Sequence, residues 1–431
     1  MSRPDLVVDD AVVVTMDADR SVLHGWVAVV DGVIAEVGTG RAPDAAARID
    51  AGGGVLHPGF VSVHQHSMDA LGRAARGDAQ EFFDWLFGTY YGAVLTYGPE
   101  DAARAVRLTA TDLARAGVTT VVDCWGVGDA GSDRARACLD ATVEAADASG
   151  LRWIVAPMVS DRLPEGWAPM LAAAPPPFRS DALTAPTPEA LAFAADALGL
   201  ARGRVEVWVS TELPEMATDD LLRGLVALAD DAGCGITTHV CASEPGAVDV
   251  TGERAVARLD RLGILREGML AAHLTHTDES DRAALAASGA GAGHCASSTM
   301  FGGGGRSPLG ELVAAGVPVG LGLDNATLNA TADMGAEMRH ALMFDRAAGS
   351  GPRRANAADL LAHATIEGAR ALGRADRIGS IEPGKAADLV LLDASGSHWE
   401  PRRDPATAIV LQARVDDIRL VLVGGEPVHR R

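Results

Sequence analysis

Residues 60 to 66 read Phe60-Val-Ser-Val-His-Gln-His66, a run of apolar and small residues that ends in two histidines. Three later runs of the same kind end in His239, His273 and Asp324. Each run is typical of a buried strand. The two histidines of the first run stand two residues apart, so both side chains point to the same side of that strand. The sequence therefore predicts a cluster of imidazoles and one carboxylate at the ends of four strands.

Between these runs, Ala-rich helical segments alternate with the strand-like segments, which is the pattern of βα units and a parallel sheet. Eight strand-like runs are present, and eight parallel strands close a barrel. We therefore expect an α/β fold, a (β/α)8 TIM-type barrel, whose strands all open their carboxyl ends onto one face. The expected strands are Phe60 to His66, Val118 to Cys124, Leu151 to Val159, Val205 to Thr211, Gly235 to Cys241, Met269 to Leu274, Ala290 to Cys295 and Val317 to Leu323.

Both ends of the chain carry short alternating apolar runs instead. Those near the N-terminus are separated by turn residues such as Asp31-Gly32, and matching runs follow Ala387 as far as the Gly424-Gly425 turn. Neither set can close a core alone, so we expect the two termini to pair into one small β-sandwich. The predicted domains are residues 1–57 with 376–431 for the composite β-sandwich, and residues 58–375 for the barrel.

The composition excludes several classes of function. The chain has 431 residues and a formal net charge of −21, with no basic cluster, so we expect no nucleic-acid partner. No apolar run approaches the roughly 20 residues that span a bilayer, so we expect no membrane partner. Asp9 and Asp10 stand where a secretory signal has its apolar core, which favours a cytoplasmic location. The five cysteines are odd in number and form no Cys-x-x-Cys pair, which argues against a disulfide framework or a zinc ribbon.

The histidines and the aspartate suit one divalent metal ion. Imidazole with a carboxylate is a ligand set for zinc, which we expect here, and also for iron. A bound ion lowers the pKa of water and supplies hydroxide near neutral pH. Asp324 is expected to ligate the ion and also to move a proton. His273 is expected to orient or polarise the electrophilic centre of the substrate.

Six stretches carry a resemblance to a known family. They are His57-Pro-Gly-Phe-Val-Ser-Val-His-Gln-His66, Gly117-Val-Thr-Thr-Val-Val-Asp123, Ala272-His273, Gly293-His-Cys-Ala-Ser-Ser298, Ala315-Gly-Val-Pro-Val-Gly-Leu-Gly-Leu-Asp324 and Ile381-Glu-Pro-Gly-Lys-Ala-Ala-Asp-Leu-Val-Leu391. Together they resemble the amidohydrolase superfamily over nearly the whole chain. The most similar branch holds cytosine, guanine, 8-oxoguanine and S-adenosylhomocysteine deaminases together with triazine hydrolases.

The resemblance implies a role for each residue of the cluster. His64, His66, His239 and Asp324 match the metal ligands of the family, and His273 matches its substrate-polarising histidine. Some members hold two metals bridged by a carboxylated lysine. Lys385 is the only lysine of this chain and lies outside the predicted barrel, so a single metal is expected.

The chain departs from this branch after the fifth strand. The deaminases usually have His-x-x-Glu there, and the glutamate protonates a ring nitrogen, whereas this chain has His239-Val-Cys-Ala242. Two residues are candidates for the missing acid: Glu212, at the end of the fourth strand, and Glu244, further along the same loop as Ala242. Trp85, Trp125 and Phe301 are candidates to stack on a planar ring.

We therefore expect a mononuclear metal-dependent amidohydrolase that deaminates a small N-heterocyclic substrate or hydrolyses a related C–N or C–X bond. One alternative is an atypical member that acts on an amide, thioether or halide leaving group, or that decarboxylates its substrate. Another is a catalytically silent metal-binding homologue. The branch commonly forms dimers or tetramers, so a homo-oligomer is expected.

Overall fold

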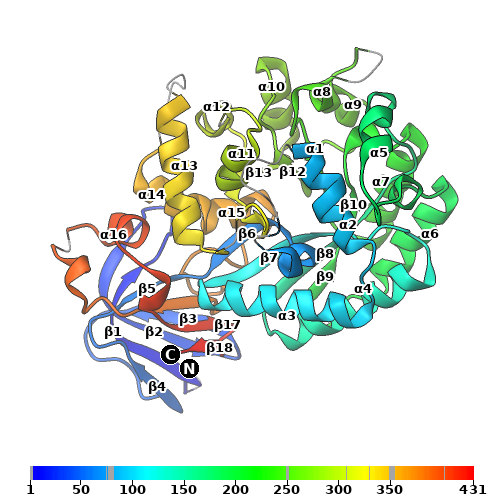
Figure 1. Cartoon of the computed structure of the whole chain (residues 1–431). Helices are drawn as coiled ribbons and strands as arrows, with labels where there is room; N and C mark the ends of the chain where they lie inside the picture. Colours follow the sequence, from blue (N-terminus) through cyan, green and yellow to red (C-terminus); the bar gives the residue numbers. More distant parts are fainter. Residues whose placement is uncertain are drawn as a thin grey trace.

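The chain folds into a barrel of parallel strands and a second sheet built from both termini (Figure 1). The computed structural model describes residues 3–73, 75, 82–248, 252–306, 308–329, 331–348, 355–401 and 403–431. Within these residues, no helix is long and apolar enough to cross a membrane. The predicted fold class is confirmed.

The barrel sheet runs in the order β14-β13-β12-β11-β10-β8-β7-β6-β15, with β9 paired to β8. Its strands are β6 (Phe60–His66), β7 (Val118–Trp125), β8 (Arg152–Val159), β9 (Val205–Val207), β10 (Val209–Thr211), β11 (Ile236–Val240), β12 (Met269–His273), β13 (Gly291–His294), β14 (Val319–Leu321) and β15 (Asp324–Asn325). Each of the eight predicted strands is present. Two differ from the prediction: β9 and β10 divide the fourth strand, and the eighth is shortened to β14, with β15 following directly after Leu323.

The interruption of the eighth strand matters for the barrel. After β14, two residues separate it from β15, which pairs in parallel with β6 through Asp324 to Gln65 and Asn325 to His66. The last strand therefore bonds to the first, and the barrel closes. The pairing also places Asp324 beside the two histidines of β6.

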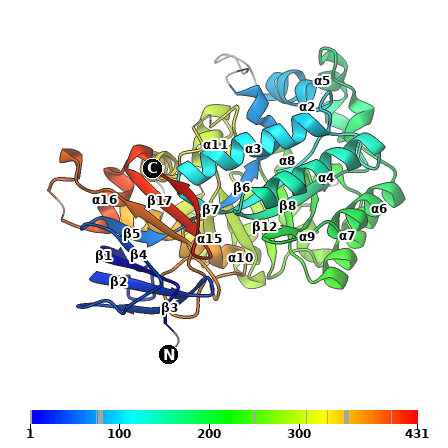
Figure 2. The same ribbon diagram turned by 90° about the horizontal axis from the view of Figure 1, so that it is seen from below.

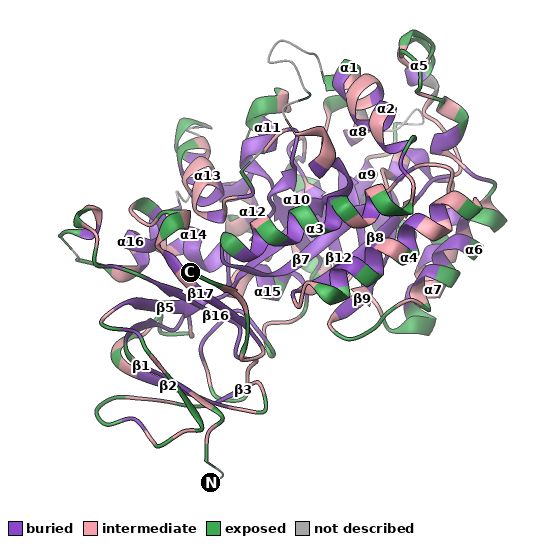
Figure 3. Cartoon of the chain, turned by 60° about the horizontal axis from the view of Figure 1, so that its bottom comes forward, coloured by how far each residue is buried: buried purple, intermediate pink, exposed green. Residues whose placement is uncertain are grey.

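Helices surround the barrel (Figure 2), and their outer faces are exposed while the strands between them are buried (Figure 3). Local sequence sets their ends: in α7 the Thr218 side chain accepts from the Leu221 N–H, and Gly233 ends the helix in the left-handed conformation at φ 63°. The helices are α1 (Phe82–Asp84), α2 (Gly92–Val94), α3 (Pro99–Arg115), α4 (Asp133–Ala148), α5 (Ala168–Ala173), α6 (Thr187–Leu198), α7 (Asp219–Ala232), α8 (Glu244–Ala247), α9 (Ala255–Arg261), α10 (Glu279–Ser288), α11 (Ala296–Gly302), α12 (Leu309–Ala315), α13 (Met334–Ala348), α14 (Ala357–His363), α15 (Ile366–Ala371) and α16 (Pro405–Leu411). Shorter 3₁₀ turns include η1 (Ser67–Gly72), and η2 (Trp85–Tyr91) is a π-helical segment between α1 and α2.

The termini form one eight-stranded sheet in the order β18-β17-β16-β5-β1-β2-β3, with β4 paired to β1. Its strands are β1 (Leu6–Val14), β2 (Val22–Val30), β3 (Val33–Gly38), β4 (Ala47–Asp50), β5 (Val55–Pro58), β16 (Leu389–Leu392), β17 (Ile418–Val423) and β18 (Glu426–Arg430). The sheet is mixed, because β4 and β5 run parallel to β1 and the other pairs are antiparallel.

This terminal sheet folds over one shared core. Ile34 of β3 packs in the same buried cluster as Leu420 and Leu422 of β17, although β3 and β17 lie near opposite ends of the strand order. The two hairpin turns also meet, since a Cβ on Gly32 would lie 2.7 Å from the carbonyl oxygen of Gly424. The two ends of the sheet thus face each other, which gives the expected sandwich of both termini.

Candidate functional site

Five predicted side chains meet at the carboxyl ends of four barrel strands. The ring of His64 lies 4.9 Å from those of His66 and His239 and 5.2 Å from that of His273, between centroids. Asp324 reaches them from β15. His273 and Asp324 both have positive φ, 73° and 59°, which is uncommon for residues other than glycine and is found where surrounding structure holds a functional side chain in place.

The polar atoms of this cluster point at one another. Nε2 of His66 lies 3.1 Å from Nε2 of His239. Oδ1 of Asp324 lies 3.4 Å from Nε2 of His64 and 3.6 Å from Nε2 of His66. Buried Nε2 of His64 has no hydrogen-bond partner among the described residues. Four donor atoms therefore converge on one small volume.

The protonation states follow from burial and from the carboxylate. Burial lowers the pKa of His64 to about 4, and those of His66 and His239 to about 3, so all three imidazoles are neutral at pH 7. Burial opposes ionisation of Asp324, but the close contact of its Oδ1 with His64 and the other nearby imidazoles hold its pKa well below the usual value. The cluster carries one negative charge and three neutral nitrogens.

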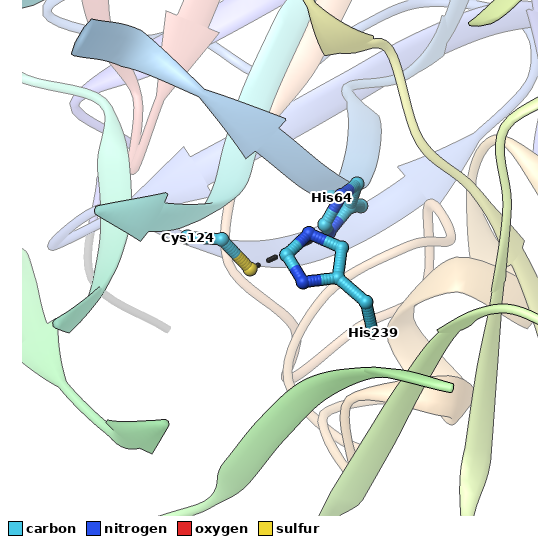
Figure 4. A group of neighbouring side chains, drawn as sticks. All are labelled: His64, Cys124 and His239. Carbon is cyan, nitrogen blue, oxygen red and sulfur yellow. Dashed lines mark hydrogen bonds between the residues drawn. The ribbon is translucent and has the colours of Figure 1, made fainter. Parts of the chain in front are cut away.

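Neighbouring groups fix which ring nitrogens are free. Nδ1 of His239 lies 2.6 Å from the backbone carbonyl oxygen of Glu212, so Nδ1 carries the hydrogen and Nε2 presents a lone pair. Nδ1 of His64 lies 3.4 Å from Sγ of Cys124, which ends near the imidazoles of His64 and His239 (Figure 4). The hydroxyl of Ser298 donates to Oδ2 of Asp324 at 2.5 Å, which leaves Oδ1 facing the imidazoles.

The cluster has the chemistry of a metal centre. In a tetrahedral zinc site with bonds of about 2.0–2.1 Å, neighbouring ligand atoms lie about 3.3 Å apart. The separations of 3.1, 3.4 and 3.6 Å in the cluster are close to this value. His64, His66 and Asp324 form one group of donor atoms that could hold an ion. Cys124 lies in a second such group, but burial raises the pKa of its thiol far above neutrality, so it stays protonated and is a poor ligand.

The cluster forms the floor of a pocket of about 740 Å³. Its walls are largely aromatic and aliphatic, and among the described residues they contain no arginine or lysine. Of the three aromatic candidates, Trp85 lines the pocket, and Trp125 and Phe301 are not among its lining residues. The indole N–H of Trp85 donates to Oγ1 of Thr327 at 2.9 Å. The other apolar lining residues are Phe82, Phe83, Leu86, Tyr90, Met158, Trp167, Leu213 and Leu328. Such a pocket suits a flat, neutral ring.

The two candidate acids lie in different places. Glu212 lines the pocket, and burial raises its pKa to about 7, although the hydroxyl of Tyr91 lowers it in part. Glu244 begins α8, is exposed, and is not among the residues that line the pocket. Ala242 lies on the pocket wall, so no carboxylate occupies that position. The structure thus brings Glu212, and not Glu244, to the cluster.

Sequence reasoning missed two polar contacts of the cluster. Cys124 faces His64, and Ser298 fixes Asp324. Cys124 ends the second barrel strand, so its position at the carboxyl edge was a usable signal. Ser298 lies within α11, and its sequence position alone does not point to Asp324.

The comparisons with known proteins agree with this geometry. The amidohydrolase family model matches residues 55–428. The chain is 30% identical over 433 residues to the 5-methylthioadenosine/S-adenosylhomocysteine deaminase of Symbiobacterium thermophilum, which covers 98% of this chain and 93% of that protein. It is 28% identical to the 5'-deoxyadenosine deaminase of Methanosarcina mazei, with 98% and 92% covered.

Solved structures show the same fold. An adenosine deaminase from Xanthomonas campestris with bound zinc has a TM-score of 0.86 at 27% identity, covering 99% of this chain and 93% of that chain. Atrazine chlorohydrolase from Arthrobacter aurescens, complexed with zinc, has a TM-score of 0.87 at 23% identity, covering 99% and 95%. At this lower identity the second likeness concerns the fold alone.

Proposed function

Because the chain belongs to the amidohydrolase family, we propose that it is a metal-dependent deaminase of a neutral adenine nucleoside. The broader prediction, a hydrolase that acts on N-heterocyclic compounds at C–N bonds, is confirmed by the family and by the deaminase relatives. The observation that carries the narrower proposal is the convergence of three neutral imidazoles and Asp324 at the floor of an aromatic pocket without cationic side chains in its described lining.

A divalent metal is supported by the donor groups of the cluster and by zinc in structures of relatives. We assign His64, His66, His239 and Asp324 as the ligands and zinc as the ion. When bound, it would acidify a water molecule and so supply a nucleophile near neutral pH. One carboxylate with three neutral nitrogens leaves a net positive site, which suits that role.

The remaining chemistry falls to the side chains around the cluster. The water oxygen adds to the ring carbon that bears the amino group, and Asp324 takes up the proton that this water loses. Asp324 then passes the proton to the amino nitrogen, which leaves as ammonia while the added hydroxyl becomes a carbonyl. The hydroxyl proton is released at that point and offsets the proton that the ring nitrogen takes up, so the protonated acid is restored for the next cycle. His273, beside His64 and His239, orients the carbon under attack.

Glu212 replaces the acid that is missing at Ala242. As the water oxygen adds, the neighbouring ring nitrogen needs a proton, and a neutral carboxyl on the pocket wall can donate it. Two observations support this role: Glu212 lines the pocket, and its burial favours the protonated form up to about pH 7. The backbone carbonyl of Glu212 also accepts from Nδ1 of His239, so the proposed acid lies directly beside one of the proposed metal ligands.

The position of Ala242 favours a second candidate. If Glu212 does not deliver the proton, the site would suit a substrate whose leaving group departs without ring protonation, such as a halide or thioether. Turnover without release of ammonia would identify this case.

The test combines metal analysis with an ammonia assay. Purified protein should hold one zinc per chain by mass spectrometry of the metals, and His66→Ala should hold much less. Ammonia should be released from adenosine, 5'-deoxyadenosine, 5-methylthioadenosine or S-adenosylhomocysteine, but not from adenosine monophosphate, because the described pocket has no cation for a phosphate. Bound zinc without turnover of any of these compounds, of other purines and pyrimidines, or of triazines would contradict the proposal and favour a silent homologue.

The expected dimer or tetramer and the cytoplasmic location stay predictions. Light scattering of the purified protein tests the first, and fractionation of the source cells tests the second.

A further inference from the structure

A second cleft lies at the other end of the barrel, where the strands begin. It has a volume of about 730 Å³ and lies between the amino ends of β7 to β9 and the terminal sheet, which contributes Val33 and Ala386. Four arginines line it: Arg152, Arg204, Arg374 and Arg377. The pocket above the proposed metal ligands has no arginine among its described lining residues, so the two cavities differ in the charge of their walls.

Two of these arginines are neutralised by carboxylates. Arg152 donates to both oxygens of Asp388, from Nε at 2.7 Å and from Nη2 at 3.1 Å. Arg374 pairs with Glu206 at 2.6 Å, and its guanidinium lies 6.0 Å from the ring centre of Trp208. These pairs hold both side chains in place on the wall of the cleft.

Of the other two arginines, Arg204 has no carboxylate partner among the described residues, and Arg377 has only a loose one. Arg204 donates to the carbonyl oxygen of Gly150 at 2.9 Å. Arg377 is exposed, and its nearest carboxylate oxygen, on Asp376, lies 4.0 Å away. The cleft therefore has a net positive charge in a chain whose formal net charge is −21.

Two buried polar atoms of the cleft have no partner among the described residues. Thr120, on β7, is only 3% exposed, and its hydroxyl makes no hydrogen bond. Nε of Arg374 is also buried and unpaired. Leaving a buried polar group unpaired is unfavourable, so such groups point to an additional hydrogen-bond partner.

We propose that this cleft binds a phosphate group, free or as a phosphomonoester, between the barrel and the terminal sheet. A tetrahedral oxyanion offers several acceptor oxygens, which suits guanidinium groups approaching from different sides and the hydroxyl of Thr120. Arg204 and Arg377 neutralise its charge. A ligand that binds the folded cleft and not the unfolded chain stabilises the protein, and this binding does not depend on the proposed deaminase activity.

The test is a titration of the metal-loaded protein with inorganic phosphate, followed by calorimetry and by the thermal unfolding midpoint. Potassium chloride at matched ionic strength is the reference. A second arm compares glycerol 3-phosphate with glycerol, which distinguishes a phosphomonoester from free phosphate. A third arm uses malonate, which offers carboxylates in place of phosphate. We expect one phosphate per chain and a higher midpoint in phosphate than in chloride.

Variants locate the site. Arg204→Gln with Arg377→Gln should weaken phosphate about a hundredfold, since each charge-assisted bond is worth about tenfold or more. Thr120→Val keeps the volume of the side chain and should weaken phosphate about fivefold, the value of one neutral hydrogen bond. Arg104→Gln with Arg107→Gln removes the same charge from the exposed face of α3 and should leave binding unchanged.

Three results would overturn the proposal. The first is equal stabilisation by phosphate and by chloride at the same ionic strength. The second is unchanged phosphate affinity in both the arginine variant and Thr120→Val, which would place the anion elsewhere, for example at the metal. The third is tighter binding of malonate than of either phosphate compound, which would assign the cleft to carboxylates.

Discussion

Replacement of Glu212 by glutamine tests the proton donor of the proposed reaction. At its ordinary pKa of 4.5 the carboxyl would be protonated in about one molecule in 300 at pH 7, whereas burial raises the pKa to about 7, at which about half of the molecules are protonated. Burial thus increases the protonated fraction of Glu212 at pH 7 more than a hundredfold. General acid catalysis is typically worth about 10²–10⁴ in rate, so Glu212→Gln should lower kcat by at least a hundredfold.

The assay is ammonia release across pH 5 to 9, with metal content measured on the same samples. In the wild type, kcat/KM should fall about tenfold per pH unit once Glu212 loses its proton, and this basic limb should vanish in Glu212→Gln. A bound cation favours the carboxylate and moves the limb to lower pH, so its disappearance in the variant, rather than its position, is decisive. Glu244→Gln is the matched control, because Glu244 is exposed and off the pocket, and it should behave as wild type. Wild-type turnover in Glu212→Gln with normal zinc would remove Glu212 from the mechanism.

Three further predictions concern the surroundings of the site. Cys124→Ala removes the partner of His64 Nδ1 and should weaken zinc affinity about 10- to 100-fold in a chelator competition; unchanged affinity would leave Cys124 a packing residue. Trp85→Phe loses the bond to Thr327 and should raise KM about fivefold with little change in kcat, and an unchanged KM would place the substrate away from Trp85. Burial raises the pKa of Glu337 to about 7 from 4.5, so its contribution to stability is fully present below pH 4.5 and is lost as the pH rises through 7. Relative to Glu337→Gln, the wild type should therefore lose about 3 kcal/mol of unfolding free energy between pH 4 and pH 8, and a difference that is constant with pH in denaturant titrations would refute this.

Much of the fold was predictable because a strand of a parallel barrel is buried on both faces. Such strands are continuous apolar runs, and the histidines of β6, His239 and His273 stand at the ends of theirs. All strands of a parallel barrel end on the same face, so polar side chains at the strand ends are expected to meet there. The terminal strands were predictable for a different reason, since turns such as Asp31-Gly32 mark hairpins.

Contacts that depend on the direction of a side chain were not predictable. Glu212 and Glu244 both follow strands that end at the site, and the sequence favours Glu212 only because it directly ends an apolar strand. In the structure Ser243 caps the N-terminus of α8, because its hydroxyl accepts from the N–H of Gly246. The helix therefore begins at Glu244, and the Glu244 side chain is exposed. Likewise, nothing near Ser298 in sequence shows that its hydroxyl meets Asp324. The break between β14 and β15 also depends on three-dimensional packing, because the run from Val317 to Leu323 is uninterrupted in sequence.

The pairing of β15 with β6 gives the proposed ion a mechanical role. Asp324 and the β6 histidines come from the last and first strands of the barrel, so the ion would cross-link the two strands whose pairing closes the barrel. No fragment that lacks either strand can assemble the complete ligand set, and full affinity would arise only after the cylinder is complete. Removal of the ion should consequently destabilise the β15–β6 pair before the rest of the barrel. The amide hydrogens of β15 and β6 should then exchange earliest.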